Sequence, residues 1–119
     1  MRFNGITTST YQWQQILGEQ TVASAEYGNN TNAITVGRIG QSPGWNNEIT
    51  SIIDIYRYSE TGAYTNIFHS TKVLYGGTFH HWTGSGTQST AQALSSITFF
   101  PSAAGATFSA GTVYVYGVK

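Results

Sequence analysis

Apolar and polar residues alternate along most of this chain with a period of two. The clearest example is the range 48–58, where Ile53 and Ile55 share one face and Ile52 and Tyr56 share the other. Successive side chains of a β-strand point to opposite faces, so this period predicts strands. No long stretch free of glycines and β-branched runs shows the 3.6-residue spacing of a helix. The pattern therefore predicts an all-β protein.

Glycine-rich and polar segments divide the chain into short predicted strands. The range 11–19 offers a partial helical match, but its alternation favours a strand. Gly62 supplies the positive φ of a hairpin turn at 59–63, and Gly84-Ser85-Gly86 is expected to end a strand. The predicted strands cover 11–19, 32–39, 48–58, 64–70, 72–75, 78–82, 92–100 and 112–118. About eight short strands with frequent turns are typical of an antiparallel β-sandwich, here of the jelly-roll type.

The length of 119 residues predicts a single domain over 1–119, large enough to bury one core. Because the chain has no cysteine, its stability must come from packing and backbone pairing rather than from disulfides. The polar segment 4–10 suggests that residues 1–10 form an extended N-terminal arm that orders on a neighbouring subunit. No apolar run is long enough to span a membrane, and no secretory signal follows residues 1–5. We therefore expect synthesis in a cytoplasm.

The charge content restricts the partners of the protein. Five basic and five acidic residues give a formal net charge of zero, and only 8% of all residues are charged. A typical soluble domain has about 25%, so this surface must be built from Ser, Thr, Asn, Gln and Gly. Five scattered cations do not form the basic stripe that nucleic acids require. With few charges to protect exposed strand edges, we expect the edges to pair between subunits of an oligomer.

The C-terminal third carries the most specific motif. Residues 93–101 have the sequence ALSSITFFP, and a short loop connects them to residues 108–119, FSAGTVYVYGVK. This pair of segments resembles the ending of many tailed-phage structural proteins. The segment 53–58, IDIYRY, is similar to a central stretch of the same group. The resemblance covers roughly residues 49–119, and the preceding residues do not extend it.

The resemblance implies a role in a virion, after synthesis in the host cytoplasm. The group includes head decoration proteins, appendage tips and baseplate parts, which the motif does not separate. A small chain with zero net charge and no shaft repeat favours a capsid decoration or cement protein, expected to form a homotrimer and to bind the major capsid protein. The alternative is a receptor- or carbohydrate-binding tip, with a host surface glycan as partner. Within the motif, the side chains expected to point into the core are Ile97, Phe99, Val113 and Val115.

Few residues suit catalysis or metal binding. Glu48 and Asp54 share a strand face but lie about 20 Å apart at ~3.4 Å per residue, too far for the paired carboxylates of a glycosidase. His80 and His81 are adjacent in a predicted strand, so they point to opposite faces and do not readily bind one ion. We expect them to hydrogen-bond at a strand end or a subunit contact. The prediction is therefore neither an enzyme nor a protein with a cofactor.

Aromatic residues are the main binding candidates. Trp45 falls in the loop 42–47, where an exposed indole would stack on a sugar or insert into a partner. The alternative is that this indole folds back and caps the sandwich. Four tyrosines are predicted to cluster around one hairpin, where they either line an interaction surface or pack in the core. The complete set of interface candidates is Trp45, Tyr56, Tyr58, Tyr64, Tyr75, His80 and His81.

Overall fold

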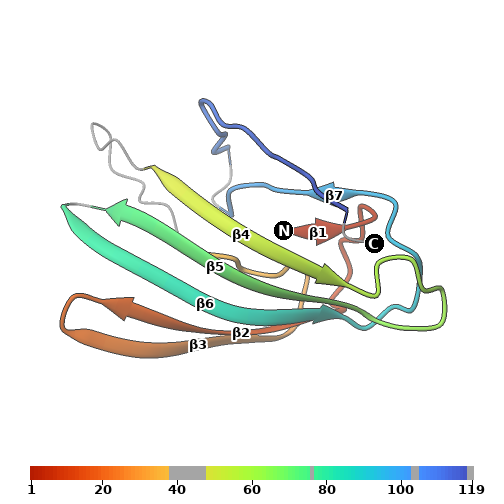
Figure 1. The fold of residues 1–119 in the computed structure, drawn as a ribbon. Coiled ribbons are helices and arrows are strands. Elements are labelled where there is room, and N and C mark those ends of the chain that lie inside the picture. Colours follow the sequence, from red (N-terminus) through yellow and green to blue (C-terminus); the bar gives the residue numbers. More distant parts are fainter. Residues whose placement is uncertain (38–47, 76, 103–104, 118–119) are drawn as a thin grey trace.

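The computed structural model contains seven strands and no helix in the residues it describes, which are 1–37, 48–75, 77–102 and 105–117 (Figure 1). The strands are β1 (Arg2–Phe3), β2 (Tyr11–Glu19), β3 (Val22–Thr31), β4 (Ile49–Tyr56), β5 (Thr65–Tyr75), β6 (Thr78–Gln88) and β7 (Ile97–Thr98). The prediction of an all-β antiparallel fold is confirmed, and its two sheets are compatible with a β-sandwich. Within the described ranges, no helix is available to cross a membrane.

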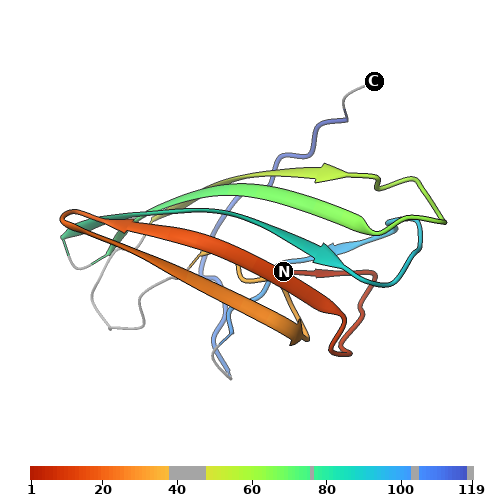
Figure 2. The ribbon, with the colours of Figure 1, turned by 90° about the horizontal axis from the view of Figure 1, so that it is seen from below.

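The larger sheet has five antiparallel strands in the order β3-β2-β6-β5-β4. Hairpins join β2 to β3, β4 to β5 and β5 to β6, and the pairing of β2 with β6 brings distant parts of the chain together. Strands β1 and β7 form a second, two-stranded sheet in which Phe3 lies opposite Ile97. Figures 1 and 2 show this small sheet on one side of the large sheet. The large sheet therefore has an inner face toward the small sheet and an outer, open face.

The core lies between the two sheets. Its buried apolar cluster is formed by Met1, Phe3, Tyr11, Ile34 and Ile67. The Tyr11 hydroxyl accepts a hydrogen bond from the Phe3 amide at 2.9 Å, and the Met1 amine donates to the carbonyl of Ile34 at 2.7 Å. The expectation of an extended arm at residues 1–10 is therefore corrected. Residues 4–10 are polar, but the apolar residues Met1 and Phe3 come before them. These two side chains are buried and hold the start of the chain in the core.

Strand β6 is longer than predicted, because Gly84-Ser85-Gly86 continues it instead of ending it. A Cβ atom on Gly86 would lie 2.9 Å from the Ile34 side chain, so glycine here lets the buried Ile34 pack against the sheet. Ile34 itself belongs to an irregular segment, not to the predicted strand over 32–39, of which the structure describes residues 32–37. The predicted strands 64–70 and 72–75 form the single strand β5.

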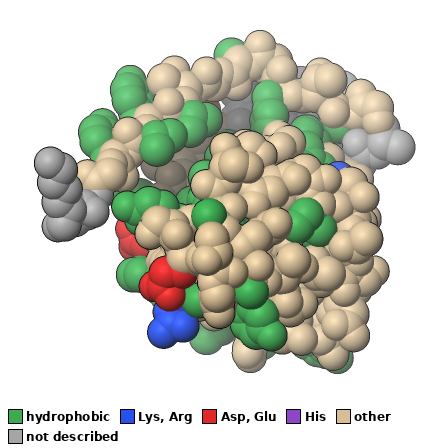
Figure 3. Space-filling view, turned by 90° about the vertical axis from the view of Figure 1, so that its right-hand side faces the viewer, with side chains coloured by type: hydrophobic (Ala, Val, Ile, Leu, Met, Phe, Trp, Pro, Cys, Tyr) green, Lys and Arg blue, Asp and Glu red, His purple; other side chains and the backbone are tan. Residues whose placement is uncertain are grey.

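The C-terminal third departs most from the prediction. Only Ile97–Thr98 form a strand in the range 92–100, and the described residues 111–117 form none. Ile97 packs against the core as expected, whereas Phe99, Val113 and Val115 are exposed. The end of the chain projects from the body in Figure 2, and Figure 3 shows hydrophobic side chains gathered beside a hollow on this side of the molecule. The segment has the period of a strand, but it pairs with none of the described residues.

Candidate functional site

The open face of the five-stranded sheet is unusually apolar for a solvent-exposed surface. Its large exposed side chains are Ile16, Tyr27, Ile52, Tyr56, Phe68, Leu74 and Phe79. Between them lie mainly Ser, Thr, Asn and Gln residues, and the described strands place only two charged side chains here, Asp54 and Lys72. Extended exposed apolar patches mark interaction sites in soluble proteins. This face is therefore the main candidate for binding.

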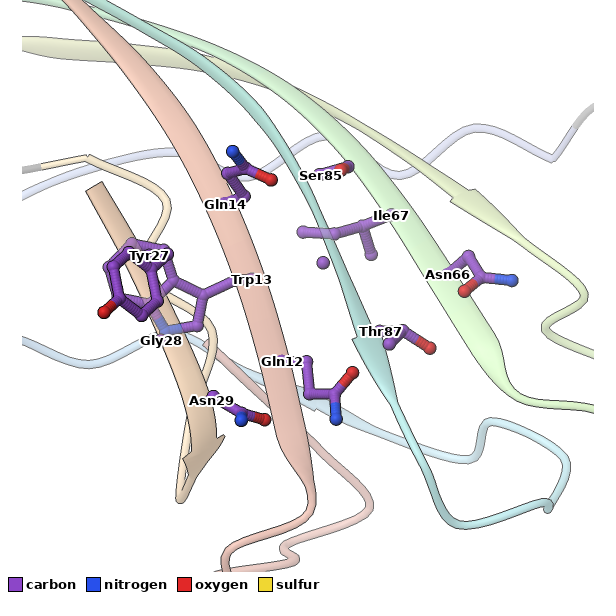
Figure 4. Close-up of a pocket in the computed structure, with 11 residues that line it drawn as sticks. Gln12, Trp13, Gln14, Tyr27, Gly28, Asn29, Asn66, Ile67, Ser85 and Thr87 are labelled. Atoms are coloured by element: carbon purple, nitrogen blue, oxygen red, sulfur yellow. The ribbon is translucent and has the colours of Figure 1, made fainter. Parts of the chain in front are cut away.

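A shallow depression of about 810 Å³ lies on the sheet across β3, β2, β6 and β5 (Figure 4). Tyr27 stands on its β3 side with 79% of its surface exposed, and Asn66 stands on its β5 side. Between them, neutral amides and hydroxyls line the surface: Gln12, Gln14, Asn29, Ser85 and Thr87. Amide and hydroxyl groups both donate and accept hydrogen bonds. The depression can thus bind a neutral, polyhydroxylated ligand beside an aromatic ring.

Gly28 and Gly86 line the depression with backbone atoms of β3 and β6. A Cβ atom on either glycine would point to the inner face of the sheet, toward Trp13 or Ile34. A Cβ atom on Gly28 would collide with the indole nitrogen of Trp13, which shows that this indole packs closely against β3. Because Tyr27 and Gly28 are successive residues of a strand, the Tyr27 ring points to the opposite face. Tyr27 thus rests on a strand that Trp13 holds in place from the inner side.

The predicted tyrosine cluster forms only in part. Tyr56, Tyr58 and Tyr64 are all about half exposed, and they lie near the end of the β4–β5 hairpin. Tyr75 ends β5, so it lies roughly 35 Å from Tyr64 at ~3.3 Å per residue. The prediction of four tyrosines around one hairpin is thus wrong for Tyr75. Trp45 lies outside the described residues.

The two adjacent histidines point to opposite faces, as predicted. His80 lies on the inner face, where its ring stacks on Trp82 with centroids 5.5 Å apart and its Nε2 is 3.7 Å from Glu19 Oε1. His81 lies on the open face and hydrogen-bonds Ser70 at 2.9 Å through Nε2. Only His81 is therefore accessible to a partner. In the part of the chain that the structure describes, no three His, Cys, Asp or Glu residues gather into a metal-binding group.

A third histidine, His69, is not one of the predicted interface candidates. It lies in the centre of β5 on the inner face with 1% of its surface exposed. Neither ring nitrogen has a hydrogen-bond partner among the described residues, and burial lowers the pKa of the imidazole from 6.5 to about 4. The burial of His69 could have been predicted, because the alternation of the sequence places it on the same strand face as Ile67 and Thr71. His69 is therefore a core residue with a neutral imidazole, and protonating this imidazole would destabilise the folded state.

Comparison with known proteins adds no assignment to this geometry. Scans against protein-family models, curated proteins and solved structures gave no match. The function is therefore inferred from the chain's own residues and their arrangement.

Proposed function

We propose that the protein is a structural component of a phage virion, a decoration or cement protein that stabilises the capsid through subunit contacts. The observation that carries the proposal is the open sheet face, with its exposed Ile52, Phe68 and Tyr56 among uncharged polar residues. Aromatic and aliphatic side chains dominate the centres of protein interfaces, whereas charged residues are depleted there. This composition supports a lasting contact with protein.

The stabilisation would be mechanical. Each copy would place its open face, together with Tyr58 and Tyr64 at the hairpin end, against the major capsid protein and neighbouring copies, most simply as a homotrimer. Zero net charge removes long-range repulsion between copies that lie side by side. An interface of standard size buries about 1,600 Å², and a shell that repeats such contacts many times resists expansion. The proposal assigns the chain a binding role without catalysis or a cofactor.

Adding the purified protein to expanded capsids that lack it is expected to raise their melting temperature by several degrees, as measured by calorimetry. Replacing Ile52 and Phe68 together by serine is expected to abolish most of this rise, because both side chains are exposed on the open face. Thr61→Ala, in the exposed loop after β4, is the matched control and should stabilise capsids like the wild type. Capsids whose melting temperature is unchanged by the wild-type protein would refute the proposal.

A second candidate function is a carbohydrate-binding tip of a virion appendage. One observation favours it, namely the neutral depression in which the exposed Tyr27 lies next to amide side chains of Gln14 and Asn29. Sugar rings present an apolar face that packs on an aromatic ring, while their hydroxyls exchange hydrogen bonds with amides. The absence of charge among the lining residues favours a neutral glycan.

Tyr27→Ala is expected to weaken glycan binding about tenfold, since an aromatic contact contributes about 1 kcal/mol or more. Glycan-array screening of the wild type, followed by titration of any hit, measures this effect. Tyr58→Ala is the control, because Tyr58 is exposed outside the depression. An array without hits, together with no binding to host envelope material, would eliminate this candidate.

A further inference from the structure

The C-terminal arm, defined here as residues 106–117, is exposed along its whole length and bends only at Ser109 and Ala110. Its large apolar side chains are exposed by 49% at Phe108, 68% at Val113, 75% at Tyr114 and 82% at both Val115 and Tyr116. Figure 1 shows the arm passing the β4 side of the molecule, and Figure 2 shows it projecting away from the sheets. An exposed apolar segment of this length is costly in water, so a partner is expected to cover it.

The arm has the sequence of a strand that is buried on both faces. Val113 and Val115 lie on one side, Tyr114 and Tyr116 on the other, and no proline interrupts residues 106–117. Valine and tyrosine favour the extended backbone, and runs that are apolar on both faces are typical of interior strands. The backbone groups of residues 111–117 form no hydrogen bond within the described chain. The arm is thus able to add a strand to a sheet edge.

Strand β4 is the sheet edge best suited to receive it. Its pairing with β5 continues from Ile49 to Tyr56 without a bulge, and its residues include neither proline nor lysine, which protect edges elsewhere. The other edge strand, β3, pairs with β2 through a register shift and has a positive φ at Asn30. At ~3.4 Å per residue, the eight residues of β4 span about 27 Å and the arm segment 111–117 about 24 Å. The lengths match.

We propose that the C-terminal arm of one copy adds to β4 of a second copy, so that the copies exchange arms. Among the described residues, each copy has an arm without a partner strand and an edge strand with one open side. Arm exchange gives the backbone groups of both elements hydrogen-bond partners in every copy. Reciprocal exchange gives a dimer, and cyclic exchange closes the expected homotrimer. The inference rests on the proposed function and deepens it, because it names the elements that join the copies.

Charge and area agree with a second copy as the partner. Asp54 is the only charged residue in β4, and residues 106–117 contain none, so the pairing brings no like charges together. Each arm tyrosine offers on the order of 150 Å² for burial, and the two valines and Phe108 add to it. Since a copy both donates and accepts an arm, its buried surface approaches the roughly 800 Å² per partner of a stable interface.

Cysteine cross-linking distinguishes arm exchange between copies from pairing within one chain. Because the native chain has no cysteine, only the introduced cysteines react. Equal amounts of Ile52→Cys and Tyr114→Cys proteins, mixed and treated with a short bismaleimide, are expected to give a covalent mixed dimer. Ile16→Cys mixed with Tyr114→Cys is the matched control, because Ile16 is also more than half exposed on the open face but lies on β2. In the double variant I52C/Y114C, cross-links confined to single chains would overturn the proposal.

The oligomeric state gives a second, independent measurement on the full chain. Val115→Asp is expected to convert the oligomer to a folded monomer in sedimentation analysis, since the charge would lie in the exchanged strand. Thr21→Asp adds the same charge in the exposed turn between β2 and β3, away from the arm and from β4, and should leave the oligomer intact. An oligomer that survives Val115→Asp and gives no mixed cross-link would refute arm exchange while leaving capsid binding open. Arm exchange with no effect on capsids would instead refute the proposed function alone.

Discussion

Gly84→Ala is expected to lower the free energy of unfolding by about 3 kcal/mol, the upper part of the range for overpacked interiors. A Cβ atom at this position would collide with the carbonyl oxygen of Gln14 and lie 2.8 Å from the Cα atom of Gln15. Both are backbone atoms of β2, which cannot rotate away as a flexible side chain does. Strand β6 is also fixed on its other side by β5, so a shift of β6 would disturb two ladders at once.

The matched control is Gly18→Ala, a glycine of β2 in the same sheet. Its added Cβ would meet only the carbonyl oxygen of His81, at an ordinary 3.9 Å. Glycine in a strand interior costs about 0.5–1 kcal/mol relative to alanine, so this variant should be as stable as the wild type or slightly more stable. Urea unfolding followed by tryptophan fluorescence measures both variants. Equal stability of Gly84→Ala and Gly18→Ala would show that β2 and β6 do not approach each other this closely.

Gly84 also illustrates why part of the fold could be predicted and part could not. The strands β2 and β4 follow from local alternation, which the sequence displays directly. The hairpin between β4 and β5 was also predicted, although the positive φ in this connection is at Arg57 and not at the predicted Gly62. The glycines of β6 have the same local signature as a turn. Their actual role is to admit Gln15 and Ile34, which lie 69 and 52 residues earlier in the chain. A single sequence does not reveal such a contact.

Strand β3 was missed for a related reason. Its sequence, VASAEYGNNT, is rich in small and polar residues and is mostly exposed, so it lacks the apolar alternation that identifies a strand. It forms through the tight turn at Gln20, where φ is +35°, and through its ladder with β2. The C-terminal arm is the opposite case, because its alternation is clear but the described chain offers it no partner. An alternating sequence shows that a segment can form a strand, but the rest of the fold determines whether a partner strand is present.

Some of the binding candidates could likewise be predicted from the sequence, and others could not. The opposite directions of His80 and His81 follow from strand geometry alone, and they were predictable. The depression beside Tyr27 needs β3, β2, β6 and β5 side by side, and the sequence pattern predicts neither β3 nor the order of the strands. Tyr27 was therefore not identified, although 79% of its surface is exposed.

Acid is expected to destabilise the protein through His69, by about 1.4 kcal/mol per pH unit within the affected window. The pKa of His69 is lowered from 6.5 to about 4 because burial disfavours the charged imidazole. Between these values the unfolded chain binds a proton that the folded chain does not. Stability from this residue is therefore complete above pH 6.5 and falls as the pH drops, levelling off below about 4. The total loss is on the order of 3 kcal/mol, a large fraction of the stability of a small domain.

His69→Leu is expected to remove this dependence, with unfolding by urea at about pH 7 and about pH 4.5 as the measurement. At neutral pH the variant should be at least as stable as the wild type, because neither ring nitrogen has a described hydrogen-bond partner to lose. Thr71→Val is the control on the same strand face; it loses the hydrogen bond to the Val36 carbonyl and should be weakened equally at both pH values. Glu26, which accepts a hydrogen bond from Gln15, and the other acidic residues are the same in the wild type and in the variant. The difference between the two proteins thus isolates His69, and identical acid slopes would mean that the imidazole is protonated in the folded chain.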